Sequence, residues 1–104
     1  MGSAFLQRPQ TGVPVPVLVD FWAPWCAPCR VAAPFFDQVA RRLKGDAIVL
    51  KVDTEANPEA GARYGIRAIP TAILFQGGHE RERRMGVQQA PSLESWLRGA
   101  SAAA

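Results

Sequence analysis

The chain has 104 residues, of which 48% are hydrophobic and 20% charged, and its formal net charge is +3. These proportions are close to globular averages, so the composition excludes a wholly disordered chain. The length predicts one domain over residues 1–104, large enough to bury a core of its own. No apolar run approaches the roughly 18 residues of a membrane span, and residues 1–9 lack the pattern of a signal peptide. We therefore expect a small cytoplasmic protein.

The chain contains two cysteines and one histidine, which is too few for a structural zinc site with four Cys or His ligands. His79 lies far from Cys26 and Cys29 in the sequence, in a polar stretch where an exposed hairpin residue is expected. The count alone leaves a Cys–His nucleophile pair open. Arginines are dense at 81–84, but glutamates interleave with them and no aromatic residues alternate as in a nucleic-acid stacking platform. We expect no metal and no nucleic-acid or membrane partner.

The first half of the chain predicts a strand followed by a helix. Residues 1–14 carry weak signals, with a short helix expected at 4–8. An apolar strand is expected at 15–22, where Asp20 is the one charged residue. A helix is expected from the cysteines to Lys44, because apolar residues recur at helical spacing. Its stripe consists of residues 31, 35, 39 and 43, widened by residues 32, 36 and 40.

The second half predicts three more strands and two helices. Asn57-Pro58-Glu59 indicates a helix start, with Asn57 as the N-cap, and Gly77-Gly78 indicates a hairpin turn. The strand–helix–strand order predicts a right-handed parallel crossover, and the hairpin adds an antiparallel pair. The fold class is therefore α/β, a mixed central sheet with helices on both faces. Strands are expected at 47–52, 72–75 and 81–86, helices at 57–65 and 91–99, and a frayed tail at 100–104.

The segment Cys26-Ala27-Pro28-Cys29 follows the buried strand and opens a helix. Two cysteines three positions apart on a first helical turn can close a disulfide and reopen it. The unpaired amides and the dipole of the helix N-terminus stabilise the thiolate of the outer cysteine. This spacing also occurs in metal sites, but the chain has no second ligand pair. The spacing therefore indicates redox chemistry.

Three segments resemble the thioredoxin family. Residues 20–30 (DFWAPWCAPCR) resemble its active-site segment, and residues 64–71 (YGIRAIPT) resemble the segment that faces it. Residues 51–56 (KVDTEA) are most similar to the bacterial thioredoxin-2 branch. The resemblance covers about residues 15–98 and implies a thioredoxin fold. The family's landmark spacings are intact from Asp20 to Lys51, from Cys26 to Pro70 and from Cys26 to Gly86.

The resemblance implies a thiol–disulfide oxidoreductase that reduces protein disulfides. Cys26 would be the nucleophile that forms a mixed disulfide, and Cys29 would resolve it. Burial should raise the pKa of Asp20, which would accept the proton of Cys29 with Lys51 as its charge partner. No cofactor would be bound, because the Cys26–Cys29 disulfide is itself redox-active. NADPH would act indirectly, through a thioredoxin reductase.

The resemblance also implies a substrate-binding rim around the cysteines. Pro70 would correspond to the family's cis proline, leaving the Ile69 backbone free to pair with a substrate strand. Trp25 would be docking surface, whereas Trp22 is expected in the core. The implied rim consists of Trp25, Ala27, Pro28, Ile66, Ala68, Ile69, Pro70 and Gly86.

Two features depart from the family pattern. Ala27 stands where thioredoxins usually carry Gly. Because the two residues between the cysteines tune the redox potential, this difference is expected to shift it. About 14 residues precede the segment at Val15, whereas thioredoxins have a strand and a full helix before it. The thioredoxin-2 branch often carries an N-terminal zinc ribbon, and this sequence does not contain the cysteines of such a ribbon. We therefore expect about four strands, with the first edge strand missing. Residues 47–52 then form an uncovered edge, which is compatible with a monomer or a weak edge-strand dimer.

Two rival functions stay open beside the reductase. A disulfide oxidase or isomerase would need a less reducing potential, which Pro28 next to Cys29 does not favour. A redox-impaired binding or holdase module would use the same apolar groove, with incidental cysteines. Retention of Asp20 together with both cysteines favours the reductase, because a binding module has no use for a buried carboxylate.

Overall fold

The computed structural model describes residues 14–102, and of residues 101 and 102 the backbone only. The helix expected at residues 4–8 therefore lies outside the described residues. The elements are β1 (Val17–Trp22), α1 (Ala27–Arg42), β2 (Ile48–Asp53), α2 (Pro58–Arg63), β3 (Thr71–Gln76), β4 (His79–Met85) and α3 (Ala90–Ala102).

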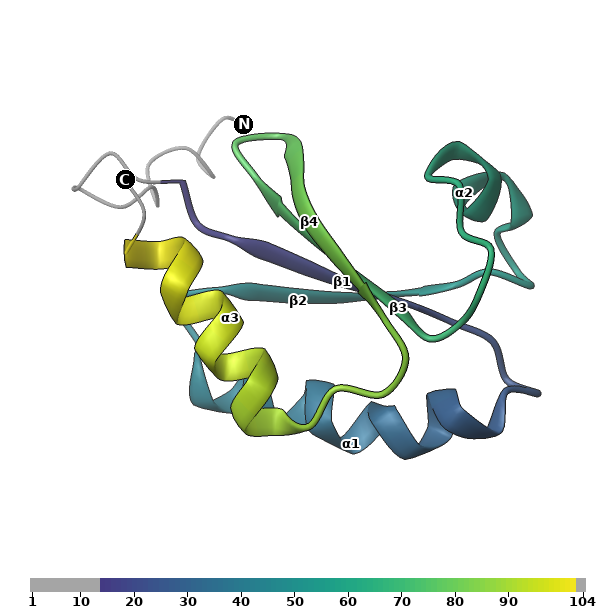
Figure 1. Ribbon diagram of the computed structural model, residues 1–104, viewed down its shortest axis with the longest axis horizontal. Helices are drawn as coiled ribbons and strands as arrows, with labels where there is room; N and C mark the ends of the chain where they lie inside the picture. The colour runs from purple at the N-terminus through teal and green to yellow at the C-terminus, as the bar shows by residue number, and fades with distance from the viewer. Residues whose placement is uncertain (1–13, 103–104) are drawn as a thin grey trace.

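Four strands form one mixed sheet in the order β2-β1-β3-β4. β1 pairs in parallel with β2 and antiparallel with β3, and β3 pairs antiparallel with β4. Gly77 and Gly78 join β3 to β4 with φ angles of 63° and 81°, a conformation that glycine adopts without steric cost. The helices α1 and α3 cover one face of the sheet, and α2 lies on the other (Figure 1). The predicted α/β sheet with helices on both faces is confirmed.

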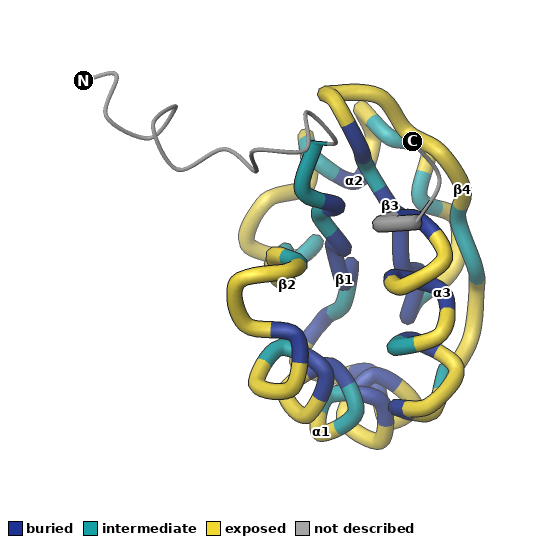
Figure 2. The backbone as a smooth tube through the Cα atoms, turned by 90° about the vertical axis from the view of Figure 1, so that its left-hand side faces the viewer, coloured by how far each residue is buried: buried dark blue, intermediate teal, exposed yellow. Residues whose placement is uncertain are grey.

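The core has a large cluster on one side of the sheet and a smaller one on the other. The large cluster joins Leu18 of β1 and Leu74 of β3 to the facing sides of α1 and α3. The smaller cluster contains Val19, Phe21 and Ile73, which point to the opposite face. Burial is concentrated in β1 and β3 and in the inner sides of α1 and α3 (Figure 2). β1 is buried on both faces, which explains why its sequence is apolar on both.

The buried stripe of α1 differs from the predicted one at its first position. Val31 is 58% exposed, whereas Ala32, Phe36, Val39 and Leu43 are buried. A strict spacing of four residues drifts around a helix that has 3.6 residues per turn. The buried residues instead follow one another at spacings of four, three and four positions. These spacings keep their side chains on one side of the helix. The prediction that Val31 belongs to the stripe is therefore wrong.

One predicted helix end also differs, and one helix start is confirmed. The prediction that Gly99 closes the last helix is wrong, because α3 continues to Ala102. Ala100 lies in the core and its carbonyl accepts a hydrogen bond from the Gln76 side chain at 3.2 Å, so the tail is helical through this point. The predicted start of α2 is confirmed, because Asn57 is the N-cap and Pro58 the first helical residue. The Asn57 side chain makes no capping hydrogen bond; its Nδ2 donates to the Asp53 carbonyl at 3.1 Å.

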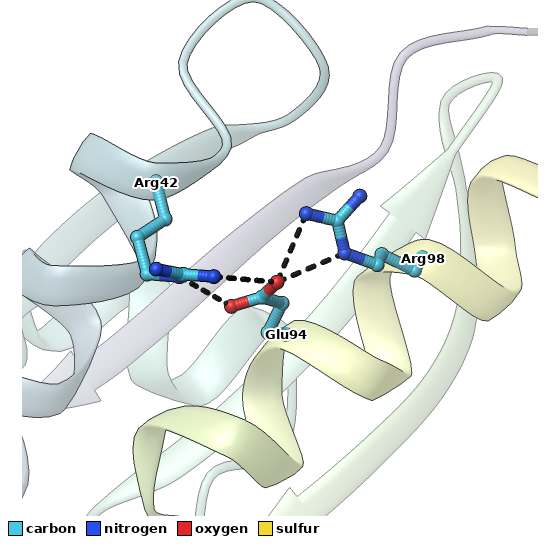
Figure 3. A network of polar contacts seen from close by, with 3 residues as sticks. All are labelled: Arg42, Glu94 and Arg98. Atoms are coloured by element: carbon cyan, nitrogen blue, oxygen red, sulfur yellow. Dashed lines mark hydrogen bonds and ion pairs between the residues drawn. The ribbon is translucent and has the colours of Figure 1, made fainter.

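An arginine–glutamate network fastens α3 to α1 (Figure 3). Glu94 of α3 accepts hydrogen bonds from Arg42 Nε of α1 at 2.7 Å and from Arg98 Nε at 2.9 Å. Both hydrogen bonds lower the pKa of Glu94, and the one from Arg42 has the larger effect. The network fixes the end of α1 that is remote from the cysteines.

Strand β2 lies at one edge of the sheet that residues 14–102 form, as expected. Ile48 and Leu50 on this strand are 47% and 50% exposed. The weak dimer through this edge stays a prediction, which sedimentation over a range of concentrations tests.

At the other edge of the sheet, His79 is exposed at the start of β4. Among residues 14–102, no helix is both long and apolar enough to cross a membrane.

Candidate active site

Cys26 and Cys29 form a disulfide at the start of α1, with their Cα atoms 5.2 Å apart. Cys26 is the N-cap of this helix, with extended backbone angles (φ −89°, ψ 108°). Its Sγ accepts a hydrogen bond from the backbone amide of Cys29 at 3.2 Å. An N-cap atom that accepts such a bond also lies at the positive end of the helix dipole. Negative charge on Cys26 Sγ is therefore stabilised.

The disulfide lies just under the surface. Cys26 is 4% exposed and Cys29 2% exposed, whereas the neighbouring Trp25 is 67% exposed. Ala23 and the two cysteines form a small cluster against which Trp22 and Ile69 pack. Trp22 is partly buried beside the disulfide and not in the main core, which corrects its predicted place. Trp25 is an exposed surface residue, as predicted.

The segment around Pro70 lies against the cysteines, as the resemblance to the family implies. The Ile69–Pro70 peptide bond is cis, and the Ile69 carbonyl oxygen is 3.8 Å from Cys26 Sγ. The Pro70 carbonyl accepts a hydrogen bond from the Gly86 amide at 2.8 Å. Residues that are distant in the sequence thus meet beside Cys26.

Asp20 lies behind the disulfide, in the middle of β1. It is 2% exposed, and its Oδ1 has no hydrogen-bond partner. Burial raises the pKa of Asp20 to about 6, in the predicted direction, while the charge of Lys51 opposes the increase and that of Asp37 adds to it. A cavity of about 100 Å³ is bordered by Asp20, Trp22, Cys29, Arg30, Ala33 and Lys51.

Lys51 is the Cα partner of Asp20 on the neighbouring strand, but its ion pair is with a different carboxylate. Lys51 Nζ lies 2.6 Å from Asp37 Oδ1 of α1, and no ion pair joins it to Asp20 in the described part of the chain. The sequence pattern did not identify Asp37. This residue lies on the polar side of a helix, and nothing local indicates that a lysine of β2 reaches it.

Comparisons with known proteins decide the family. The thioredoxin family model matches residues 9–99. The thioredoxin of Rickettsia felis is 46% identical over 83 residues, which is 80% of this chain and 79% of that protein. Thioredoxin 1 of a Nostoc species is 47% identical, with 80% and 78% covered. The chain belongs to the thioredoxin family.

Solved structures agree with this assignment. The chloroplastic thioredoxin z structure superposes with a TM-score of 0.78 at 26% identity, covering 97% of this chain and 90% of that one. A thioredoxin variant from Halobacterium salinarum gives a TM-score of 0.77 at 33% identity, with 85% and 76% covered. The fold is the thioredoxin fold. This thioredoxin is a thiol–disulfide oxidoreductase of the protein-disulfide reductase type, and its redox-active group is the Cys26–Cys29 disulfide.

A groove of about 300 Å³ adjoins the active site of this thioredoxin. Four residues of the predicted rim line it, and so do five residues that the sequence reasoning did not identify. Three of those five belong to α2, and their small side chains carry no sequence signal for binding. Ala27, Pro28 and Gly86 are exposed elsewhere near the cysteines, and Pro70 is buried. The groove is lined by Trp25, Thr54, Pro58, Gly61, Ala62, Ile66, Arg67, Ala68 and Ile69.

Proposed function

We propose that Cys26 is the nucleophile of this reductase and that Cys29 is the resolving cysteine. The observation that carries the assignment is the hydrogen bond from the Cys29 amide to Cys26 Sγ at the N-cap of α1. This donor and the helix dipole stabilise a thiolate at Cys26 more than at Cys29, which follows within the first turn. A stabilised thiolate is the reactive species of such a nucleophile at neutral pH.

The reaction proceeds in two thiol–disulfide exchanges. In the reduced protein, the Cys26 thiolate attacks one sulfur of the substrate disulfide. The substrate S–S bond breaks, its other sulfur leaves as a thiolate and takes a proton, and a mixed disulfide forms. Cys29 then loses its proton and attacks Cys26 Sγ, which releases the second substrate thiolate. The substrate gains two electrons and two protons, and the Cys26–Cys29 disulfide of the structure is the oxidised product.

Asp20 accepts the proton of Cys29 in the second exchange. Its carboxyl and Cys29 border the same cavity, whose volume of about 100 Å³ is sufficient for water molecules that can relay a proton. With a pKa of about 6, Asp20 is mostly ionised at neutral pH and is also a stronger base than an ordinary carboxylate. Lys51 stabilises the ionised form from the side of β2.

The substrate binds as an extended segment beside Cys26. The backbone of Ile69 next to the cis Pro70 pairs with the substrate chain, and the exposed Trp25 provides apolar contact. The other proposed contacts are the remaining residues of the predicted rim. Backbone pairing makes few demands on substrate side chains, which supports disulfide-containing proteins of many sequences as substrates.

The oxidised protein returns to the dithiol state through a thioredoxin reductase that draws electrons from NADPH. Membership of the thioredoxin family supports this partner and a cytoplasmic location. The sequence KVDTEA at residues 51–56 supports placement in the thioredoxin-2 branch. Residues 1–104 constitute one domain in this proposal.

Alkylation of the reduced protein tests the assignment of the nucleophile. At pH 7 and limiting iodoacetamide, we expect Cys26 to be modified about tenfold faster than Cys29, because its thiolate fraction is larger. Mass spectrometry of the proteolytic peptides measures both rates. Equal rates, or faster modification of Cys29, would contradict the assignment.

Replacing Trp25 with Ala tests the proposed docking surface. We expect kcat/KM for insulin reduction to fall about tenfold, since truncating an aromatic contact at an interface commonly costs about 1–2 kcal/mol. The alkylation rate of Cys26 should stay unchanged, because Trp25 does not act on the thiol. Leu50→Ala is the matched control, as it truncates an exposed apolar residue on β2. A Trp25→Ala protein with unchanged kcat/KM would exclude this surface from docking.

A further inference from the structure

Three charged side chains lie close together behind the active-site disulfide, and they come from three elements. Asp20 belongs to β1, Lys51 to β2 and Asp37 to α1. Asp20 and Lys51 are Cα partners on adjacent parallel strands, so their side chains leave the sheet on the same face. Leu18 of β1 packs in the cluster of α1 and α3, which makes this the face that α1 covers. One ammonium group therefore lies near two carboxylates.

The ammonium group is paired with only one of them. Lys51 Nζ lies 2.6 Å from Asp37 Oδ1, with side chains 36% and 51% exposed. Asp20 is 2% exposed, and its Oδ1 has no hydrogen-bond partner. The carboxylate for which a charged partner would matter most is thus the unpaired one. The exposed carboxylate, which water could solvate, holds the lysine.

The other groups that face Asp20 do not supply a second cation. From β3 its Cα partner is Ala72, which carries no charge. From α1 the cavity beside Asp20 is lined by Cys29 and Arg30. Arg30 donates a hydrogen bond from a terminal guanidinium nitrogen to the Pro24 carbonyl at 2.7 Å, which directs this group toward the loop before α1. Lys51 is therefore the cation whose position matters for Asp20.

We propose that Asp37 is a positioning residue, which holds the Lys51 ammonium on the α1 side and so limits how strongly this charge stabilises the Asp20 carboxylate. The inference rests on the proposed role of Asp20 as the acceptor of the Cys29 proton. Without Asp37, the flexible lysine side chain can turn toward the unpaired Oδ1 of Asp20. The reductase would then have a weaker base behind its resolving cysteine.

Both electrostatic effects of Asp37 act in the same direction. The Lys51 charge lowers the pKa of Asp20, and the Asp37 charge raises it. Removing the negative charge of Asp37 eliminates the direct repulsion and also frees the lysine. The titration midpoint of Asp20 should therefore fall from about 6 toward the ordinary value of 3.8. If the effect passes mainly through Lys51, it should disappear once the lysine is neutral.

Carbon-13 NMR of the Asp20 side-chain carboxyl in the oxidised protein tests this inference directly. The variants are Asp37→Asn, the conservative Asp37→Glu, Lys51→Met, and Asp37→Asn combined with Lys51→Met. We expect a lower midpoint in Asp37→Asn, the wild-type midpoint in Asp37→Glu, and a higher midpoint in Lys51→Met. Adding Asp37→Asn to Lys51→Met should shift the midpoint by less than half of its effect in the wild type. Asp46→Asn, an exposed carboxylate between α1 and β2, is the control.

Two results would overturn the inference. An unchanged midpoint in Asp37→Asn would show that Asp37 has no influence on Asp20. An equal shift of the midpoint with and without Lys51 would show that Asp37 acts by direct repulsion and does not position the lysine. The pH profile of insulin reduction separates this inference from the proposed role of Asp20. If the NMR midpoint shifts mainly when Lys51 is present and the acid limb of the profile does not follow, Asp37 positions Lys51 as inferred and Asp20 is not the proton acceptor.

Discussion

Replacing Asp20 with Asn is expected to raise the free energy of unfolding of the oxidised protein by about 3 kcal/mol at pH 7. The folded-state pKa of Asp20 is about 6, against 3.8 for an ordinary aspartate, chiefly because of burial. The folded protein therefore binds the Asp20 proton more tightly than the unfolded chain does. Above pH 6 the ionised carboxylate in its buried site lowers the stability of the folded state. Asn has nearly the same shape and carries no charge, so it removes this penalty.

The pH dependence of this effect identifies its cause. As the pH falls through 6, Asp20 takes up its proton in the folded wild type, and wild-type stability rises. The advantage of Asp20→Asn should shrink to about half at pH 5 and to a small fraction at pH 4. Guanidinium unfolding at the three pH values measures it, and Asp46→Asn is the exposed control, with an expected effect under about 0.5 kcal/mol. A gain in stability that is independent of pH would contradict this account.

Replacing Cys29 with Ser is expected to convert the reductase into a single-turnover trap. Cys26 still attacks the substrate disulfide, but no thiol follows on the first turn of α1 to release the mixed disulfide. Nearly every protein molecule should then carry one covalently bound substrate chain after exposure to insulin. Catalytic turnover should fall by about three orders of magnitude or more, as is usual when an essential group of a covalent mechanism is lost. Non-reducing mass spectrometry detects the adduct.

The matched control for this trap is Cys26→Ser. It leaves Cys29, which is 2% exposed, as the single thiol, and we expect no adduct with insulin. Circular dichroism establishes that both variants are folded, so that a missing adduct reflects chemistry. Equal trapping by the two variants would contradict the assignment of Cys26 as the nucleophile.

The sequence predicts the parts of this site that depend on local pattern. The spacing of Cys26 and Cys29 at a helix start predicts the disulfide, and a charge inside an apolar strand predicts that Asp20 is buried. The α/β architecture follows from the order of apolar strands and helices. Resemblance to a family adds what local pattern does not contain, such as the position of Pro70 beside Cys26. In these cases the environment of each residue follows from the helix or strand that contains it, or from a motif shared with the family.

The remaining features depend on contacts between elements. Whether Lys51 pairs with Asp20 or with Asp37 is decided by how α1 lies over β2, which no local pattern encodes. Gly99 looks like a helix end, yet the burial of Ala100 in the core extends α3 beyond it. Val31 has an apolar side chain at helical spacing, but it lies outside the side of α1 that packs on the sheet and is exposed. Tertiary packing overrides local preference at each of these positions.

The most direct test of the central claim is insulin reduction driven by dithiothreitol, with the wild type compared with Cys26→Ser. The account predicts rapid precipitation of the insulin B chain with the wild type and only the dithiothreitol background with the variant. A folded wild-type protein that does not exceed this background would contradict the claim that the Cys26–Cys29 pair reduces protein disulfides. Activity retained in Cys26→Ser would contradict it equally.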